Sequence, residues 1–244
     1  MNVTAPISSD SSAPPVRGRR VIDAPTRATH WLLALAFVVA YVTGDTERLR
    51  PLHVSAGYVM VVLLVFRVVY GLVGPRSVRW PVLWRKAAGA PAWLRGAWRA
   101  RTLGAISWTS GTHIATGIAV LAVLGTAVPL LGSGWLVWQD VGGDVLAELH
   151  EMFGQLMLTA VGVHVAIIGV ASVVRRRNLV RPMLSGRADA PGPDVVKANR
   201  GGLAALVVVA AFGVAAWSLS DVPAADTSGR PARVSADRGG DDAD

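Results

Sequence analysis

The chain has 244 residues, of which 52% are hydrophobic and only 16% are charged, and it contains no cysteine. A soluble domain of this size is rarely so apolar, so the composition favours an integral membrane protein. The lack of cysteine excludes disulfides, thiolate-bound iron–sulfur clusters and covalent c-type haem. The net charge is +8, but the arginines lie next to the ends of apolar segments and not in one basic run. This pattern argues against a nucleic-acid partner and makes membrane lipid the surrounding medium.

Five apolar segments predict membrane-spanning helices, because about 20 apolar residues cross a hydrocarbon core of about 30 Å. In chain order they are residues 29–44, 54–74, 112–132, 152–174 and 201–220. The first segment is short, and we expect its helix to begin a few residues earlier. It has no small-residue cleavage site behind it, so we expect it to remain in the protein as a signal anchor.

The distribution of Lys and Arg predicts the orientation of these helices. Residues 75–111 carry seven basic residues and no acid, and residues 1–28 and 175–200 also carry a basic excess. Residues 133–151 carry four acids and no base, and residues 221–244 carry six acids against three arginines. The alternation predicts a multi-pass protein of the bacterial inner membrane, with its N-terminus in the cytoplasm and its C-terminus in the periplasm.

The same pattern divides the chain into parts. We expect residues 1–20 to form a disordered cytoplasmic tail, because they are rich in Ser, Pro and Asp. Residues 21–187 form a four-helix domain, residues 188–200 a cytoplasmic linker, and residues 201–220 a fifth membrane helix. Residues 221–244 form a disordered, acidic periplasmic tail.

Four of the five histidines fall at two depths of the membrane. His150 and His164 are 14 residues apart, which on a helix is within about 40° of whole turns and a rise of about 21 Å. Their imidazoles therefore point to the same side at different depths. His53 opens the second span at the same face as His150, and His30 opens the first span from the face nearer to His164. A histidine at a span end can also bond to a backbone carbonyl, but ionisable groups inside a span are costly and suggest function.

The four histidines thus sort into an outer pair, His53 with His150, and an inner pair, His30 with His164. Two neutral imidazoles that face each other across a bundle are the usual axial ligands of a b-type haem. Zinc needs three or four ligands, and each depth offers two histidines with few carboxylates nearby. The pattern therefore predicts two haems b, with these histidines as iron ligands. A haem-free transporter or proton relay is the alternative, although the spans lack the mid-depth carboxylates that a proton path would use.

Further residues fit a haem site. Gly57 and Gly154 follow His53 and His150 by four residues on the same helix face, where a flat macrocycle needs room; close helix packing would favour glycine equally. Arg67 lies 14 residues after His53, on the same side at the inner depth. A haem propionate would neutralise its charge there, and snorkelling to the headgroups is the alternative.

Two features mark the cytoplasmic side. His113 opens the third span, and we expect it to be interfacial and not a ligand. Residues 78–104 contain four tryptophans between basic residues. We expect this segment to lie on the cytoplasmic leaflet, since such side chains favour the interface; a partner site there is the second possibility.

Three stretches together resemble the bacterial cytochrome b561 family, which includes the b-type cytochrome subunits of nickel–iron hydrogenases. They are "VIDAPTRATHW", "LHVSAGYVMVVLLVFRVVYGLVGPRSVRW" and "LHEMFGQLMLTAVGVHVAIIGVASVVRRRNLVRPMLSGR", which cover most of residues 21–187. The resemblance implies two haems b in a four-helix core, with His30 and His164 at the inner haem and His53 and His150 at the outer one. The third span departs from the family, since it opens with "SWTSGTHIATG" where relatives have an Asn-Pro pair after Gly-His.

The expected fold is therefore an all-α membrane protein: a four-helix transmembrane bundle that binds two haems, plus a fifth C-terminal transmembrane helix. The resemblance implies electron transfer between the quinone pool and a periplasmic redox partner, such as a c-type cytochrome, a hydrogenase or another oxidoreductase subunit. The direction of transfer, and whether the chain belongs to an enzyme, stay open. By location alone, Arg27, Arg67 and His113 are candidates for a quinone site.

Overall fold

The computed structural model describes residues 18–188 and 192–221, so most of both predicted tails lies outside the described residues. Five of its helices are long and apolar enough to cross a membrane. They are α1 (Ala24–Thr43), α2 (Arg50–Val73), α5 (Trp108–Trp138), α6 (Gly143–Val174) and α8 (Gly201–Asp221). The five predicted spans are confirmed as helices, and the first begins earlier than its apolar segment, as expected.

The ends of these helices follow local rules. Asp23 caps α1 by accepting a hydrogen bond from the backbone N–H of Thr26, and Pro25 occupies the first turn. The turn between α5 and α6 has Gly142 at φ 80°, a left-handed conformation that glycine adopts without strain. A polar first turn then leads into the apolar part of α6, so this helix begins well before residue 152.

Shorter elements connect the long helices. They are β1 (Arg19–Arg20), η1 (Glu47–Leu49), η2 (Arg76–Val78), α3 (Trp80–Ala88), α4 (Ala90–Arg99), η3 (Leu103–Ala105), α7 (Arg181–Ser185) and β2 (Arg187–Ala188). The tryptophan-rich segment thus forms α3 and α4, two short helices with exposed Trp84 and Trp98. Whether they lie on a membrane surface stays a prediction.

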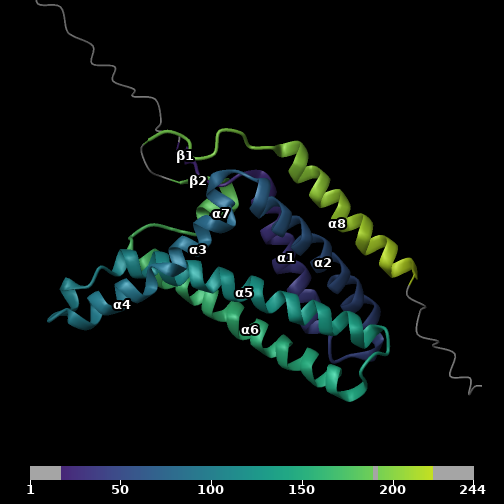
Figure 1. The fold of residues 1–244 in the computed structure, drawn as a ribbon. Helices are drawn as coiled ribbons and strands as arrows, with labels where there is room; N and C mark the ends of the chain where they lie inside the picture. Colours follow the sequence, from purple (N-terminus) through teal and green to yellow (C-terminus); the bar gives the residue numbers. More distant parts are fainter. Residues whose placement is uncertain (1–17, 189–191, 222–244) are drawn as a thin grey trace, which may run out of the picture.

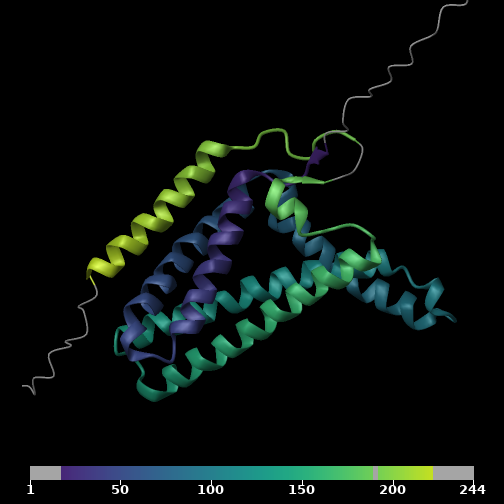
Figure 2. The same cartoon turned by 180° about the vertical axis from the view of Figure 1, so that it is seen from behind.

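The long helices form two hairpins and one added helix. Helix α1 packs against α2, α5 packs against α6, and α8 lies along both α1 and α2. Figures 1 and 2 show that the two hairpins meet at one end and diverge toward the other, where α3 and α7 lie. Helix α3 packs on α5 at this open end. The bundle therefore has one closed and one open end.

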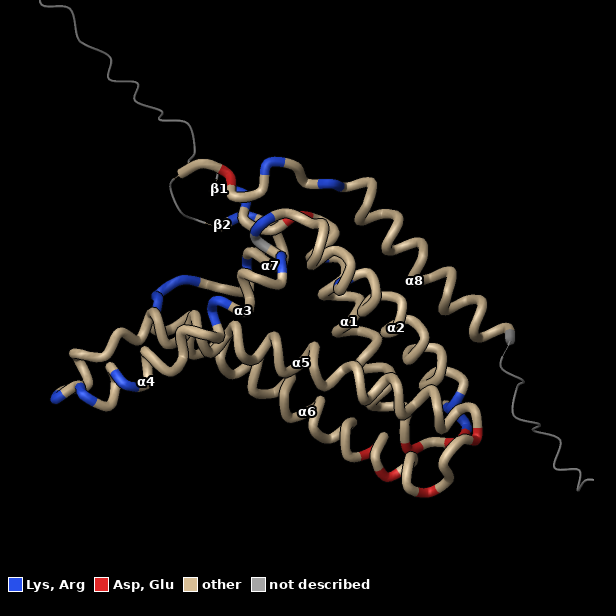
Figure 3. The backbone as a smooth tube through the Cα atoms, viewed as in Figure 1, with Lys and Arg blue, Asp and Glu red and all other residues tan. Residues whose placement is uncertain are grey.

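Charge distinguishes these two ends, as Figure 3 shows. The turn from α5 to α6 and the first turns of α6 lie at the closed end, which we call the acidic end; this segment carries Asp140, Asp144, Glu148 and Glu151. The open end carries the arginines of β1, β2, α3, α4 and α7, and we call it the basic end. The basic segments of the sequence therefore gather at one end, while the acidic end also carries Arg50, which is paired with Glu47.

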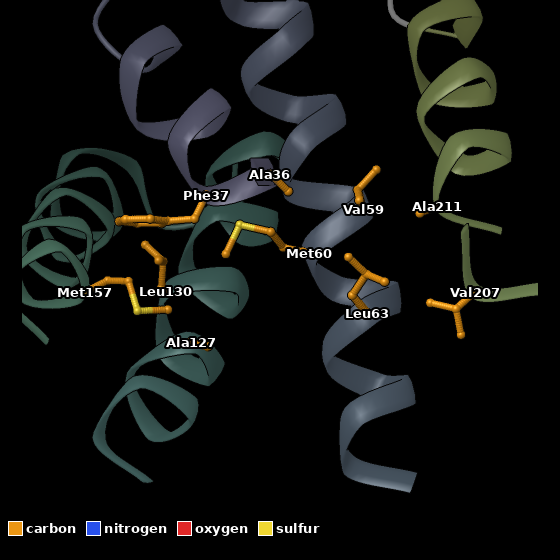
Figure 4. Packing of buried hydrophobic residues seen from close by; sticks show 10 residues of the cluster. All are labelled: Ala36, Phe37, Val59, Met60, Leu63, Ala127, Leu130, Met157, Val207 and Ala211. Carbon is orange, nitrogen blue, oxygen red and sulfur yellow. The ribbon is translucent and has the colours of Figure 1, made fainter. Parts of the chain in front are cut away.

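An apolar layer joins all four bundle helices. One buried cluster takes a side chain from each of these helices, and the four lie close together in Figure 4: Phe37 of α1, Met60 of α2, Leu130 of α5 and Met157 of α6. On the other side of α2, Leu63 is only 1% exposed and lies toward α8. Lipid is as apolar as these side chains, so the contacts stabilise the bundle through close packing.

Polar contacts fix α8 at both ends. Asp23 is fully buried and accepts a hydrogen bond from the hydroxyl of Tyr70. A guanidinium nitrogen of Arg200, one residue before α8, lies 3.4 Å from Asp23 and 3.1 Å from the Tyr70 oxygen; these contacts, chiefly the one with Tyr70, raise the pKa of Arg200. Nearer the acidic end, the hydroxyl of Ser218 donates to that of Ser55 at 2.9 Å. We call the Asp23–Tyr70–Arg200 group the α8 lock.

The segment after α6 returns to the start of α1. Strands β1 and β2 pair antiparallel, with Arg19 opposite Ala188. The backbone N–H of Val21 donates to the Gly186 carbonyl at 2.9 Å, and Arg27 donates to the Leu184 carbonyl at 2.7 Å. The last residues of the predicted N-terminal tail are thus tied to the basic end, because strand pairing satisfies their backbone groups.

Candidate functional site

The outer histidine pair of the sequence lies at the acidic end. His53, near the start of α2, and His150, near the start of α6, face each other with ring centroids 5.9 Å apart and planes at 86°. The two hairpins meet here, so side chains from both can reach one another. The structure therefore brings together two imidazoles that are 97 residues apart in the chain (150 minus 53).

Backbone carbonyls orient both rings of this pair. Nδ1 of His53 lies 2.8 Å from the carbonyl oxygen of Ala40, and Nδ1 of His150 lies 3.1 Å from that of Leu130. The Ser133 hydroxyl is a second, longer contact of His150 at 3.4 Å. Because a carbonyl only accepts, each Nδ1 donates its hydrogen, and Nε2 is the ring nitrogen left available to a metal. Histidines that bind metals are held in this way.

Glycines shape the space around this pair. A Cβ built at Gly57 or at Gly154 would meet nothing within 4 Å, so close helix packing does not require glycine at either position. Gly134 of α5 is different, because a Cβ there would lie 2.7 Å from Cε1 of His150. The orientation of His150 therefore depends on a glycine that sequence reasoning missed, since only the packing of α5 on α6 brings the two residues together.

The inner histidine pair lies in the open half of the bundle. His30 of α1 and His164 of α6 are close enough to interact electrostatically. In the described part of the chain they make no ring contact like that of the acidic-end pair, and each Nδ1 is buried without a hydrogen-bond partner. The divergence of the hairpins separates these rings more than those at the acidic end.

Other buried polar atoms at the basic end also lack partners. The guanidinium of Arg67 stacks over the ring of Trp80, with 5.3 Å from its carbon to the ring centroid, and one of its terminal nitrogens is buried and unpartnered. The hydroxyl of Thr29, the residue before His30, is also buried without a hydrogen-bond partner. A buried polar atom without a partner costs about 1–3 kcal/mol. With the nitrogens of His30 and His164, these atoms indicate a polar or charged group that the polypeptide itself does not supply.

His113 lies apart from both pairs. Its side chain is exposed on α5, and its electrostatic neighbours are Arg175 and Lys86. Among the described residues no third histidine or carboxylate joins a pair to give a set of three ligands. Arg27, another residue named from its position, is bonded to the carbonyl of Leu184.

The family model for prokaryotic cytochrome b561 matches residues 21–186. The chain belongs to the prokaryotic cytochrome b561 family. It is therefore a multi-pass membrane cytochrome that binds haem b and transfers electrons. The matched residues contain all four bundle helices, whereas α8 lies outside them. No match was found among curated proteins or among solved structures.

The residues of this cytochrome fit haem b. At the acidic end, two imidazoles lie 5.9 Å apart with both Nδ1 atoms bonded to carbonyls, and the space at Gly57 and Gly154 is open. At the basic end, unpartnered nitrogens of His30, His164 and Arg67 suit a group that combines a metal with carboxylates.

Proposed function

We propose that this cytochrome holds two haems b, one at each end of the bundle. His53 and His150 would be the iron ligands at the acidic end, and His30 and His164 those at the basic end. The observation that carries the proposal is the acidic-end pair, whose rings face each other while carbonyls hold both Nδ1 atoms. Helix α6 also carries His164, 14 residues after His150 and on the same side of the helix.

The apolar layer lies midway between the two proposed sites. Phe37, Met60 and Met157 each follow a histidine of their own helix by seven residues, a rise of about 10 Å. Bound haem supplies a metal that gains or loses one electron. The packed side chains between the two levels exclude water and ions, so that electrons can pass where ions cannot.

Arg67, Gly57 and Gly154 complete the proposed sites. The buried, unpartnered nitrogen of Arg67 supports a role in binding a haem propionate at the basic end. Gly57 and Gly154 leave space beside the acidic-end ligands. A larger side chain at either position would occupy the volume that a macrocycle needs.

We further propose that the basic end faces the cytoplasm and the acidic end the periplasm of the inner membrane, because Lys and Arg concentrate on the cytoplasmic side. Electrons would then pass between the quinone pool and a periplasmic partner, such as a c-type cytochrome, a hydrogenase or another oxidoreductase subunit. Stopped-flow mixing with a reduced short-chain quinone tests this step. We expect the absorbance of the haems to change to that of the reduced form after mixing. Haems that stay oxidised would contradict quinone as a partner.

Haem content and redox titration test the ligand assignment. We expect two haems b per chain in the parent and one in each of His53→Ala and His164→Ala, with a different potential lost in each variant. His113→Ala is the matched control, because this exposed histidine lies outside both pairs. One haem in the parent, or loss of haem in the control alone, would overturn the two-level assignment.

A further inference from the structure

Helices α4, α5 and α6 enclose an apolar groove of about 420 Å³ at the basic end. Its walls include Trp93, Trp108, Ile114 and Ile167. The indole N–H of Trp93 donates to the Ser107 carbonyl and that of Trp108 to the Leu103 carbonyl, each at 3.0 Å. The groove therefore presents hydrocarbon surface, and its two indole donors are already bonded to the backbone.

The groove is separate from the proposed haem sites. Val163, Ile167 and Val170 line it from α6. Val163 and Val170 lie about 100–120° around α6 from His164, and Ile167 lies between them and His164. None of the four paired histidines lines the groove.

A basic cluster stands at the same end of α5. Thr112 lines the groove and accepts two hydrogen bonds from Arg175, at 3.0 Å from Nε and 2.8 Å from a terminal nitrogen. His113 is the next residue, and both Arg175 and Lys86 are its electrostatic neighbours. Burial lowers the pKa of Arg175. Within the described residues no carboxylate forms an ion pair with any of the three basic side chains.

We propose that this place binds one anionic phospholipid from the leaflet at the basic end, with an acyl chain in the groove and the phosphate beside Arg175. Charge complementarity favours an anionic headgroup, because the basic cluster has no acidic counterpart. A quinone ring inside the groove would need hydrogen-bond donors for both carbonyls, but the two indoles there are bonded to the backbone and the basic side chains stand at one end only. Tryptophans such as Trp93 and Trp108 in the groove walls are typical of the level of lipid headgroups.

Native mass spectrometry of the haem-loaded protein in detergent tests this site, with phosphatidylglycerol or phosphatidylcholine added in steps. We expect one phosphatidylglycerol to bind about fivefold more tightly than phosphatidylcholine, the effect of one basic residue near an anionic surface. Arg175→Gln removes this preference. Arg176→Gln, the matched control at the exposed neighbouring residue, keeps it.

A second variant tests the groove without changing charge. Ala166 lines the groove and is exposed, so Ala166→Leu narrows it and should weaken binding of both lipids alike. An unchanged haem spectrum shows that each variant is folded. Equal binding of the two lipids by the parent, equal effects of the two arginine variants, or displacement of the lipid by a short-chain quinone would each overturn the proposal.

Discussion

Replacing Gly134 by Ala gives a direct test of how the acidic-end pair is built. The new Cβ would lie 2.7 Å from Cε1 and 3.0 Å from Nδ1 of His150. Non-bonded carbon atoms prefer separations of about 3.5–4.0 Å. The imidazole must therefore move by about 1 Å, and its hydrogen bond to the Leu130 carbonyl, now 3.1 Å, is lost or weakened.

Two contributions set the size of the effect. Overpacking of a close contact costs about 1–3 kcal/mol, and loss of a hydrogen bond about 0.5–1.5 kcal/mol. Together they amount to about 1.5–4.5 kcal/mol, and the middle of this range corresponds to an affinity for the acidic-end haem that is on the order of 100-fold weaker. The basic-end site lies far along α6 and should keep its haem.

The assay is haem content by the pyridine haemochrome method, together with a redox titration of the purified variant. We expect the haem content to fall from two toward one per chain, and the potential lost to be the one that His53→Ala also removes. Gly132→Ala is the matched control on the same helix, because a Cβ at that position meets nothing within 4 Å. A Gly134→Ala protein with both haems at unchanged potentials would refute the reasoning.

Three further substitutions test other parts of the structure. Arg67→Gln removes a buried positive charge, so a redox titration should find a basic-end haem potential that is lower by tens of millivolts, where about 59 mV is a tenfold effect. An unchanged potential would contradict contact between Arg67 and a haem propionate. Asp23→Asn breaks the α8 lock and should lower the free energy of unfolding in detergent by about 1–3 kcal/mol. Ser218→Ala should lower it by only about 0.6 kcal/mol. A larger loss for Ser218→Ala than for Asp23→Asn would contradict the lock. Gly57→Leu fills open space without a packing clash, so the protein should fold yet lose the acidic-end haem, whereas two retained haems place the macrocycle elsewhere.

The sequence predicted the spans well because apolar length is a strong signal in a membrane protein. It placed their ends less well. Helix α6 begins at Gly143 and not near residue 152, because polar residues at its start lower hydropathy without breaking the helix. Helix α5 likewise extends beyond its apolar segment at both ends. The order and orientation of the spans, together with helical rise, predicted that His53 and His150 lie at one end, and their rings are adjacent in the structure.

Contacts between segments distant in sequence were not predictable in this way. Gly134, Ala40 and Leu130 carry no chemical signal, yet they orient the acidic-end imidazoles through a missing side chain and two carbonyls. Asp23 could have been found as a helix cap, because it stands just before Pro25 and Thr26. Its bonds to Tyr70 and Arg200 could not, since they join residues 47 and 177 positions away.

The two histidine levels differ in a way that only the three-dimensional structure reveals. At the acidic end the hairpins meet, and the polypeptide alone satisfies Nδ1 of His53 and His150. At the basic end the hairpins diverge, and Nδ1 of His30 and His164 has no partner among the described residues. Pre-oriented ligands lose less conformational freedom when they bind. The proposed acidic-end ligands are thus oriented by the protein fold, whereas the proposed basic-end site contains buried polar groups that the described polypeptide does not satisfy.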